Sequence, residues 1–286
     1  MRSLLCLFCF IPLLSLPQSI KFREYKKGNH FRYKLTTESY RNNELTSKTI
    51  SISHHEIVRD SGQLCEEIKW LSKTVFQKDT LNLDSIAQKV SPYKISLLPG
   101  GNLDLPPLLI PEMTGEITDL HTFYAAVSPA LHIQRLGLKH FSFQDSLVRG
   151  NFADGKEIIK GEDCIQVTQK LLTLEKEFTF TETLFKPPTY NCLTPFIDTI
   201  GKKIFELPNN FQMIRKSAAN KVNLMWGIEE FTVVSTLDNR SGQLIKAEMV
   251  NLLQLRMRYN SSEDLKTYEA EIPLTIRRVL HLELLK

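Results

Sequence analysis

Two stretches near the C-terminal end decide the fold: QLIKAEMVNLLQLRMRY at residues 243–259 and KTYEAEIPLTIRRVLHLEL at residues 266–284. The first has mostly apolar side chains at odd positions, and the second has them at even positions. A two-residue period places each apolar set on one face of a β-sheet. Seventeen extended residues span about 56 Å, far more than the usual strand of about six residues. We therefore expect a mainly β protein with a large, curved antiparallel sheet, a half-barrel or a barrel, bent by bulges.

A third strand precedes these two and completes a β-meander. Its apolar residues from Val222 to Ile228 share one phase, and those from Phe231 to Leu237 share the other. A β-bulge at Glu229–Glu230 would restore the inward direction. The turn residues 238–242, Asp-Asn-Arg-Ser-Gly, and a second turn at 260–264 would connect the three strands.

Further strands and a few helices are expected upstream. Four apolar rows have the two-residue period and are each assigned to a buried face: Ile50, Ile52 and Val58; Leu64, Ile68 and Trp70; Ile165, Val167 and Leu171; Phe178, Phe180 and Leu184. One helix is expected to begin at Thr118–Asp119, with Leu120, Phe123, Tyr124 and Val127 on one face, and to restart at Ser128–Pro129. Short helical segments are expected at 84–90 and 194–204.

The chain is expected to form a signal peptide at 1–19 followed by a single β-rich domain at 20–286. Arg2 precedes an apolar run from Leu4 to Leu16, which is too short to span a bilayer but has the length of a signal-peptide core. The run 98–115, rich in Pro and Leu, marks either a sub-boundary between domains or, as we prefer, an ordered strap with buried leucines. We expect an exported protein, in the periplasm, the cell envelope or the extracellular space, without an integral membrane segment once the signal is removed.

The cysteines leave two alternatives. Removal of the signal would leave Cys65, Cys164 and Cys192, an odd number without zinc-site spacing. All three could be buried as small apolar residues. In an oxidising compartment, Cys164 and Cys192 could instead form a disulfide.

Composition and motifs argue against several functions. The 36 Lys and Arg and 32 Asp and Glu residues are interspersed, so no basic patch indicates a nucleic-acid partner. The sequence contains none of the common nucleophile, zinc-protease, phosphate-binding or dinucleotide-binding motifs. His54 and His55 would point to opposite faces of a strand, so they cannot share a metal ion. We therefore predict no catalytic residue, no metal and no cofactor.

Arg278 is the most informative polar residue, because it occupies an inward position in an apolar row, and Asn251 does so in the preceding strand. A buried charge is costly unless it is paired. Either the strand leaves the core there, or Arg278 pairs with a structural glutamate such as Glu229 or Glu230. A third interpretation makes Arg278 the contact for an anionic head group inside an apolar cavity.

A signal peptide, a long antiparallel meander and a few helices under a leucine-rich strap resemble the bacterial lipoprotein-carrier half-barrel superfamily, across about residues 160–286. The resemblance implies that the concave face shelters an acyl chain. That face would contain Phe178, Phe180, Trp226, Met249, Leu253, Met257 and Ile276. The candidate ligand-binding residues are then Arg278, Trp226, Phe180 and Asn251, and the expected partner is a lipid or another amphiphile.

The leading hypothesis is a non-enzymatic binding or scaffold protein. One alternative is an envelope hydrolase with His54 or His121 and a nearby carboxylate as general base. The other is a structural subunit of a surface assembly, formed through exposed strand edges.

Overall fold

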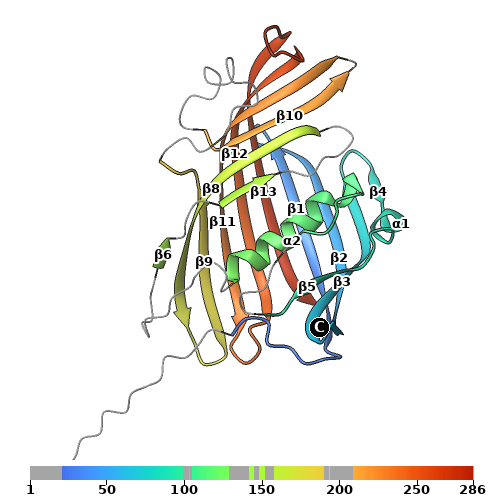
Figure 1. The fold of residues 1–286 in the computed structure, drawn as a ribbon, viewed down its shortest axis with the longest axis vertical. Coiled ribbons are helices and arrows are strands. Elements are labelled where there is room, and N and C mark those ends of the chain that lie inside the picture. Colours follow the sequence, from blue (N-terminus) through green and yellow to red (C-terminus); the bar gives the residue numbers. More distant parts are fainter. Residues whose placement is uncertain are drawn as a thin grey trace, which may run out of the picture.

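The computed structural model describes residues 21–98, 103, 105–128, 142–144, 148–151, 158–189, 193, 209–218 and 220–285. These residues are mainly β, as the sequence predicts, and one large antiparallel sheet that does not close on itself dominates the fold (Figure 1). Its strands are β1 His30–Arg41, β2 Glu44–Asp60, β3 Gln63–Phe76, β4 Thr80–Asn82, β5 Tyr93–Ser96, β6 Ser142–Gln144, β7 Val148–Asn151, β8 Ile158–Leu174, β9 Phe178–Lys186, β10 Phe211–Ala218, β11 Lys221–Asp238, β12 Leu244–Ser262 and β13 Ala270–Leu285.

The main path through the sheet runs β10-β8-β9-β11-β12-β13-β1-β2-β3-β4. Strand β5 pairs with β3, β6 and β7 pair with β8, and β10 also pairs with β11. The first and last parts of the described chain meet in the centre, because β1 pairs with β13 from Arg32–Leu285 to Arg41–Ile276. Helix α2, Thr114–Val127, crosses one face of the sheet, which we call the inner face, and α1, Asp84–Ala87, lies beside β3 and β4 (Figure 1). A 3₁₀ turn, Pro111–Met113, leads into α2.

The C-terminal meander is confirmed with its predicted register. In β12, Ala247, Met249, Leu253, Leu255 and Met257 are buried, whereas the even residues between them are exposed or half-buried. The Asp238–Gly242 turn is also present: the Asp238 carboxylate accepts hydrogen bonds from the backbone N–H groups of Arg240 and Ser241. Gly242 has φ +66°, and a Cβ there would lie 2.2 Å from the carbonyl oxygen of Lys21. Glycine is therefore required where the N-terminal segment crosses the turn.

The β-bulge predicted at Glu229–Glu230 is wrong. Strands β11 and β12 pair without interruption from Ile228↔Gln254 to Phe231↔Asn251. The apolar phase changes because two cores lie on opposite faces of β11. Val233 packs in the inner core under α2, whereas Val222, Leu224 and Trp226 pack with Ile214 and Leu265 on the outer face.

The predicted buried face is also wrong in two other strands, β2 and β9. In β2 the buried row is Ser51, Ser53, His55 and Ile57, while Ile50, Ile52 and Val58 are half-buried on the outer face. The small serines stand directly opposite the larger Leu35 and Tyr33 of β1. In β9 the buried row is Thr179, Thr181, Thr183 and Phe185, not Phe178, Phe180 and Leu184. In both strands an inner row rich in hydroxyl side chains lies under α2, so polarity alone misidentified the buried face.

The row at Ile165, Val167 and Leu171 is buried as expected, as are Ile68 and Trp70 in β3. Helix α2 begins at Thr114, four residues before the expected start, and its four predicted apolar residues are buried. Helix α1 forms within the expected 84–90 segment. The expected restart at 128–129 and the helix at 194–204 fall mainly or wholly outside the described residues.

The strap at 98–115 is partly buried where it is described. Leu103, Leu108 and Ile110 pack against the main core, whereas Leu105 and Leu109 are exposed. Cys164 is disulfide-bonded and Cys65 is a free thiol. Cys192, the expected partner of Cys164, lies outside the described residues. No helix within the described residues is long and apolar enough to cross a membrane.

Candidate ligand-binding site

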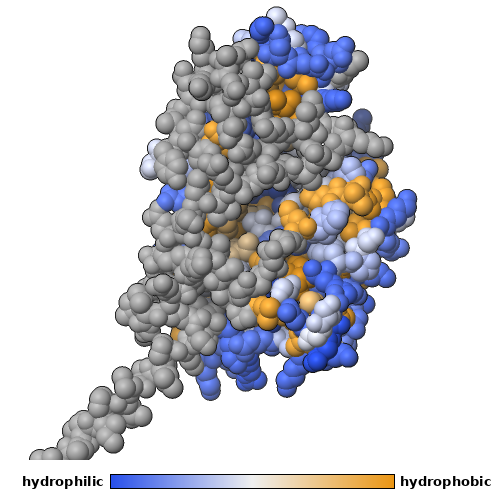
Figure 2. Space-filling model, in the orientation of Figure 1, coloured by the Kyte–Doolittle hydropathy of each residue, from blue (hydrophilic) through white to orange (hydrophobic). Residues whose placement is uncertain are grey.

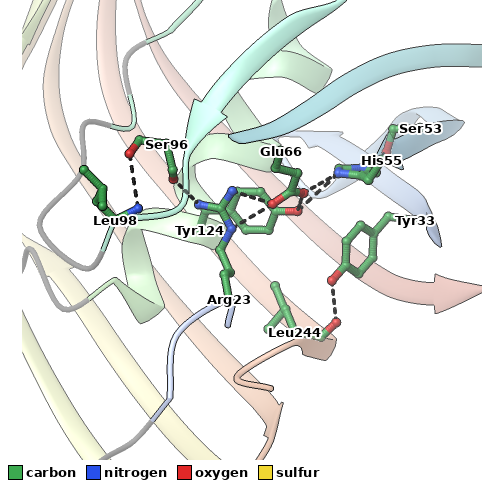
Figure 3. Close-up of polar contacts among 9 residues, drawn as sticks. All are labelled: Arg23, Tyr33, Ser53, His55, Glu66, Ser96, Leu98, Tyr124 and Leu244. Carbon is green, nitrogen blue, oxygen red and sulfur yellow. Dashed lines mark hydrogen bonds and ion pairs between the residues drawn. The ribbon is translucent and has the colours of Figure 1, made fainter. Parts of the chain in front are cut away.

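The inner face has three regions: the core under α2, a belt of polar side chains, and an apolar cavity toward the β10 end of the sheet. The core under α2 contains the largest group of buried polar residues. Figure 3 shows Arg23 and Tyr124 converging on the carboxylate of Glu66, with His55 and Ser53 beyond it. Arg23 comes from the N-terminal segment, Ser53 and His55 from β2, Glu66 from β3 and Tyr124 from α2.

Glu66 is the centre of this cluster. It accepts two charge-assisted hydrogen bonds from the Arg23 guanidinium, and its Oε1 accepts the Tyr124 hydroxyl at 2.6 Å. The His55 Nδ1 lies 2.5 Å from the same oxygen. Burial alone would raise the pKa of Glu66, but Arg23 and these hydrogen bonds lower it to about 2. Glu66 is therefore an ionised carboxylate in a fully buried position.

Ser53, His55 and Glu66 have the order of a nucleophile, a base and an orienting carboxylate. The Ser53 hydroxyl lies 2.7 Å from the His55 Nε2, which accepts its proton when Nδ1 donates to Glu66. However, Ser53 is 2% exposed, and His55 and Glu66 are 0% exposed. A substrate cannot reach the hydroxyl in this structure. The cluster instead joins α2 and the N-terminal segment to the sheet.

Neither His54 nor His121, the general bases of the hydrolase hypothesis, belongs to this cluster. His54 faces the outer side of β2, and His121 is buried in α2, where its Nδ1 lies 2.8 Å from the carbonyl oxygen of Ile117. The base–carboxylate pair forms instead at His55, the neighbour of His54. Glu66 could have been noticed in the sequence, because it shares the phase of Ile68 and Trp70 in an otherwise apolar row. Among the described residues, no group of three or more His, Cys, Asp or Glu side chains is placed to hold a metal ion.

Two ion pairs form the polar belt beside the cluster and hold α2 on the sheet. The Nζ of Lys73 in β3 lies 2.6 Å from the Oε1 of Glu116. The guanidinium of Arg278 in β13 donates two hydrogen bonds to the carboxylate of Asp119. Burial raises the pKa of both carboxyl groups despite these cations. The partner of Arg278 is therefore an aspartate on α2, not Glu229 or Glu230.

The four candidate ligand-binding residues do not share one face. Asn251 and Arg278 are direct cross-strand partners on the inner face, and Asn251 donates a hydrogen bond to the Glu229 carboxylate at 2.8 Å. Trp226 pairs with Arg256, and Phe180 with Thr236, in the opposite phase. Both rings therefore lie on the outer face, and Trp226 is covered by Leu265 and by the guanidinium of Arg258. One cavity on the inner face cannot be lined by all four.

The apolar cavity lies beyond the belt, on the same face as Leu253 and Leu255 of β12. Its volume is about 460 Å³, within the usual range for small-molecule sites. Apolar and aromatic side chains line it: Met225, Met257, Tyr259, Leu274 and Ile276. They belong to an apolar cluster distinct from the core under α2. Figure 2 shows apolar surface on this face just below the polar tip of the sheet.

The polar side chains around this cavity are mostly cationic. Arg41, Arg215 and Lys216 line it, together with Ser217 and Asn223, and no acidic side chain is among the described residues of this lining. Arg41 lies at the end of β1 and donates a hydrogen bond to the Tyr259 hydroxyl at 2.9 Å. The sequence does not reveal this site, because its residues come from strands far apart in the chain. The Met257 and Ile276 positions in their apolar rows were the only signal for it.

Comparisons with known proteins do not assign this chain to a family. No protein-family model matches the sequence, and no curated protein matches it. Among solved structures, the outer membrane protein OmpT of Vibrio cholerae, folded in vitro and in its trimer form, aligns with 91% of this chain and 100% of its own at 8% identity. The TM-score is 0.18, which is too low to support any inference.

Replacing Arg278 tests whether it is a structural partner of α2. Arg278→Met leaves the Asp119 carboxylate, which is 7% exposed, without its cation. We expect the free energy of unfolding at pH 7 to fall by about 3 kcal/mol. Because burial raises the pKa of Asp119, protonation relieves the unpaired charge, and the loss should shrink toward pH 4. Urea unfolding of both proteins at the two pH values measures this.

Arg277→Met is the matched control, since Arg277 is exposed on the other face of the same strand and its guanidinium lies over the Tyr40 ring. It should change stability by less than about 1 kcal/mol. Equal losses in the two variants would show that the Asp119 pair does not hold the helix.

Proposed function

We propose that this protein is a non-enzymatic binding protein that holds an anionic amphiphile in the cavity at the β10 end of the inner face. The observation that supports this most directly is the combination of an apolar lining with a cationic rim, without an acidic side chain among the lining residues that the structure describes. Methionine side chains are flexible and polarisable, so they adapt to an irregular apolar ligand. An arginine at the rim would make a charge-assisted hydrogen bond with the head group.

The cellular location is part of the same proposal. Residues 1–19 have the pattern of a signal peptide, and we propose that the protein acts in the periplasm, the envelope or the extracellular space. The proposal agrees in kind with the lipoprotein-carrier resemblance, in which a curved sheet shelters acyl chains. It differs in position, because α2 fills the middle of the inner face and the proposed cavity lies beyond it, at the β10 end of the sheet.

A hydrolase is less well supported. Among the described residues, Ser53, His55 and Glu66 form the arrangement of nucleophile, base and carboxylate, and Tyr124 and Arg23 pack directly on its carboxylate. Opening that site would require the displacement of α2 and the loss of the hydrogen bonds that Arg23 and Tyr124 donate to Glu66. The apolar cavity, by contrast, needs no rearrangement to receive a ligand.

Titration with a fluorescent fatty acid tests the proposal. The wild-type protein should bind it saturably, and Arg41→Gln should weaken binding about tenfold, the effect of losing roughly 1.4 kcal/mol of charge-assisted hydrogen bonding. The affinity for the corresponding fluorescent fatty alcohol should fall much less in Arg41→Gln, because the alcohol has no anionic group. Ile276→Trp, which places a larger side chain in the cavity, should weaken the binding of both probes.

Arg59→Gln serves as the control, because Arg59 is an exposed arginine at the opposite end of β2, outside the cavity lining. It should bind both probes like the wild type. Absence of saturable binding by the wild type, or equal binding by the wild type and Ile276→Trp, would contradict the proposed site.

A further inference from the structure

A second cleft lies at the other end of the molecule and plays no part in the proposed amphiphile site. Its volume is about 650 Å³. It is formed by the N-terminal segment, the first residues of β1, the middle of β2, the β11–β12 turn and the end of β13. The side chains that matter for its chemistry are Tyr25, His30, Phe31, Arg32 and His54.

Three potentially cationic side chains stand in a row across neighbouring strands, and two of them, Arg32 and His54, line this cleft. Arg32 of β1 is the direct partner of His54 of β2, and His54 is the direct partner of Lys69 of β3. Directly opposed like charges destabilise a sheet. Within the described part of the chain, no ion pair compensates Arg32 or Lys69. Lys34, two residues further along β1, is by contrast paired with Glu283 at 3.3 Å.

The surroundings of His54 show the sign of the local potential. Burial lowers the pKa of His54, and Arg32, His55 and His30 lower it further, whereas Glu56 acts in the opposite direction. The His30 and His54 rings are 6.3 Å apart.

Acidic groups only partly offset this charge. Glu24, the acidic residue in the cleft lining, lies 3.3 Å from Lys21, and Glu56 stands opposite both His30 and Glu67. A positive potential opposes a divalent cation, even though two imidazoles lie close together, and favours an anion.

We propose that this cleft binds a small molecule bearing an oxyanion, a carboxylate or a phosphate, through the Arg32 guanidinium and the His54 imidazole. Arginine presents paired N–H donors that match either group. Phe31 and Leu284, which also line the cleft, would contact an apolar part of the molecule. The bound anion would offset the part of this positive charge that the nearby acidic groups leave uncompensated.

Isothermal titration with benzoate and with inorganic phosphate tests this inference. We expect millimolar or tighter binding of at least one probe, weakened at least tenfold in Arg32→Gln and unchanged in Lys34→Gln. Tighter binding of benzoate would identify a carboxylate on an apolar surface, and tighter binding of phosphate would identify the inorganic anion. Benzyl alcohol, which has the ring without the charge, should not bind.

The pH dependence separates the role of His54 from that of Arg32. Benzoate is ionised at both pH 6 and pH 8, so stronger binding at pH 6 would report protonation of an imidazole in the cleft. His54→Gln should remove that difference and retain the dependence on Arg32. The inference is overturned if the folded wild-type protein binds neither anion, or if Arg32→Gln, with an unchanged circular dichroism spectrum, binds both as the wild type does.

Discussion

Leu255→Asp is expected to unfold the protein at neutral pH, whereas Gln254→Asp is expected to leave it folded. Leu255 is 5% exposed on the inner face between Leu253 and Met257, and Gln254 is exposed on the other face. An unpaired carboxylate in the apolar cluster costs several kcal/mol, which is comparable with the whole stability of a domain. Adjacent strand residues point to opposite faces, so the two variants differ only in the side of the sheet that receives the charge.

Circular dichroism during thermal unfolding measures the difference. The Gln254→Asp protein should melt within a few degrees of the wild type, and Leu255→Asp should lack a cooperative transition. Similar melting curves for the two variants would contradict the register of β12.

Arg23→Met is expected to produce the second large loss of stability. The substitution leaves the ionised Glu66 buried with only the hydrogen bonds from His55 and Tyr124. Breaking a buried pair on one side costs about 3–5 kcal/mol, and urea unfolding at pH 7 should show a loss of that size. Arg59→Met, at an exposed position on β2, is the control and should change stability by less than about 0.5 kcal/mol. A loss below about 1 kcal/mol for Arg23→Met would show that Glu66 is compensated without it.

The same cluster contributes to the acid sensitivity of the wild-type protein. The pKa of Glu66 is about 2 when folded and has its higher, ordinary value when unfolded. The unfolded chain therefore takes up a proton first as the pH falls, so the contribution of Glu66 is complete above about pH 4.5 and is lost on the way to about pH 2. A shift of this size corresponds to about 3 kcal/mol.

The outward-facing and inward-facing rows of the C-terminal strands were predictable from the sequence. In β12 and β13 the rows are long, and each has one apolar and one polar face, so a single rule assigns the buried side. The sequence also indicated that Arg278 and Asn251 need polar partners, because each is a polar residue in an apolar row. The partner of Arg278 could not be predicted from the sequence, since Asp119 is 159 residues away on a helix that crosses the sheet.

Local pattern by itself determined the mainly β class, the three-strand meander, its turn at Asp238–Gly242 and the apolar face of α2. The second turn, expected at 260–264, begins only after β12 ends at Ser262. Tertiary structure alone decided which face of β2, β9 and β11 is buried. In β2 and β9 the buried rows contain Ser, His and Thr, whose polar groups are buried beneath α2 and can find partners there, as Ser53 does with His55 and Thr183 with the carbonyl of Ala126. In β11 the buried face changes along the strand because separate cores form on the two sides. Burial follows from what packs against a face, and in these strands that is a segment distant in the chain, so the local alternation of polar and apolar residues could not specify it.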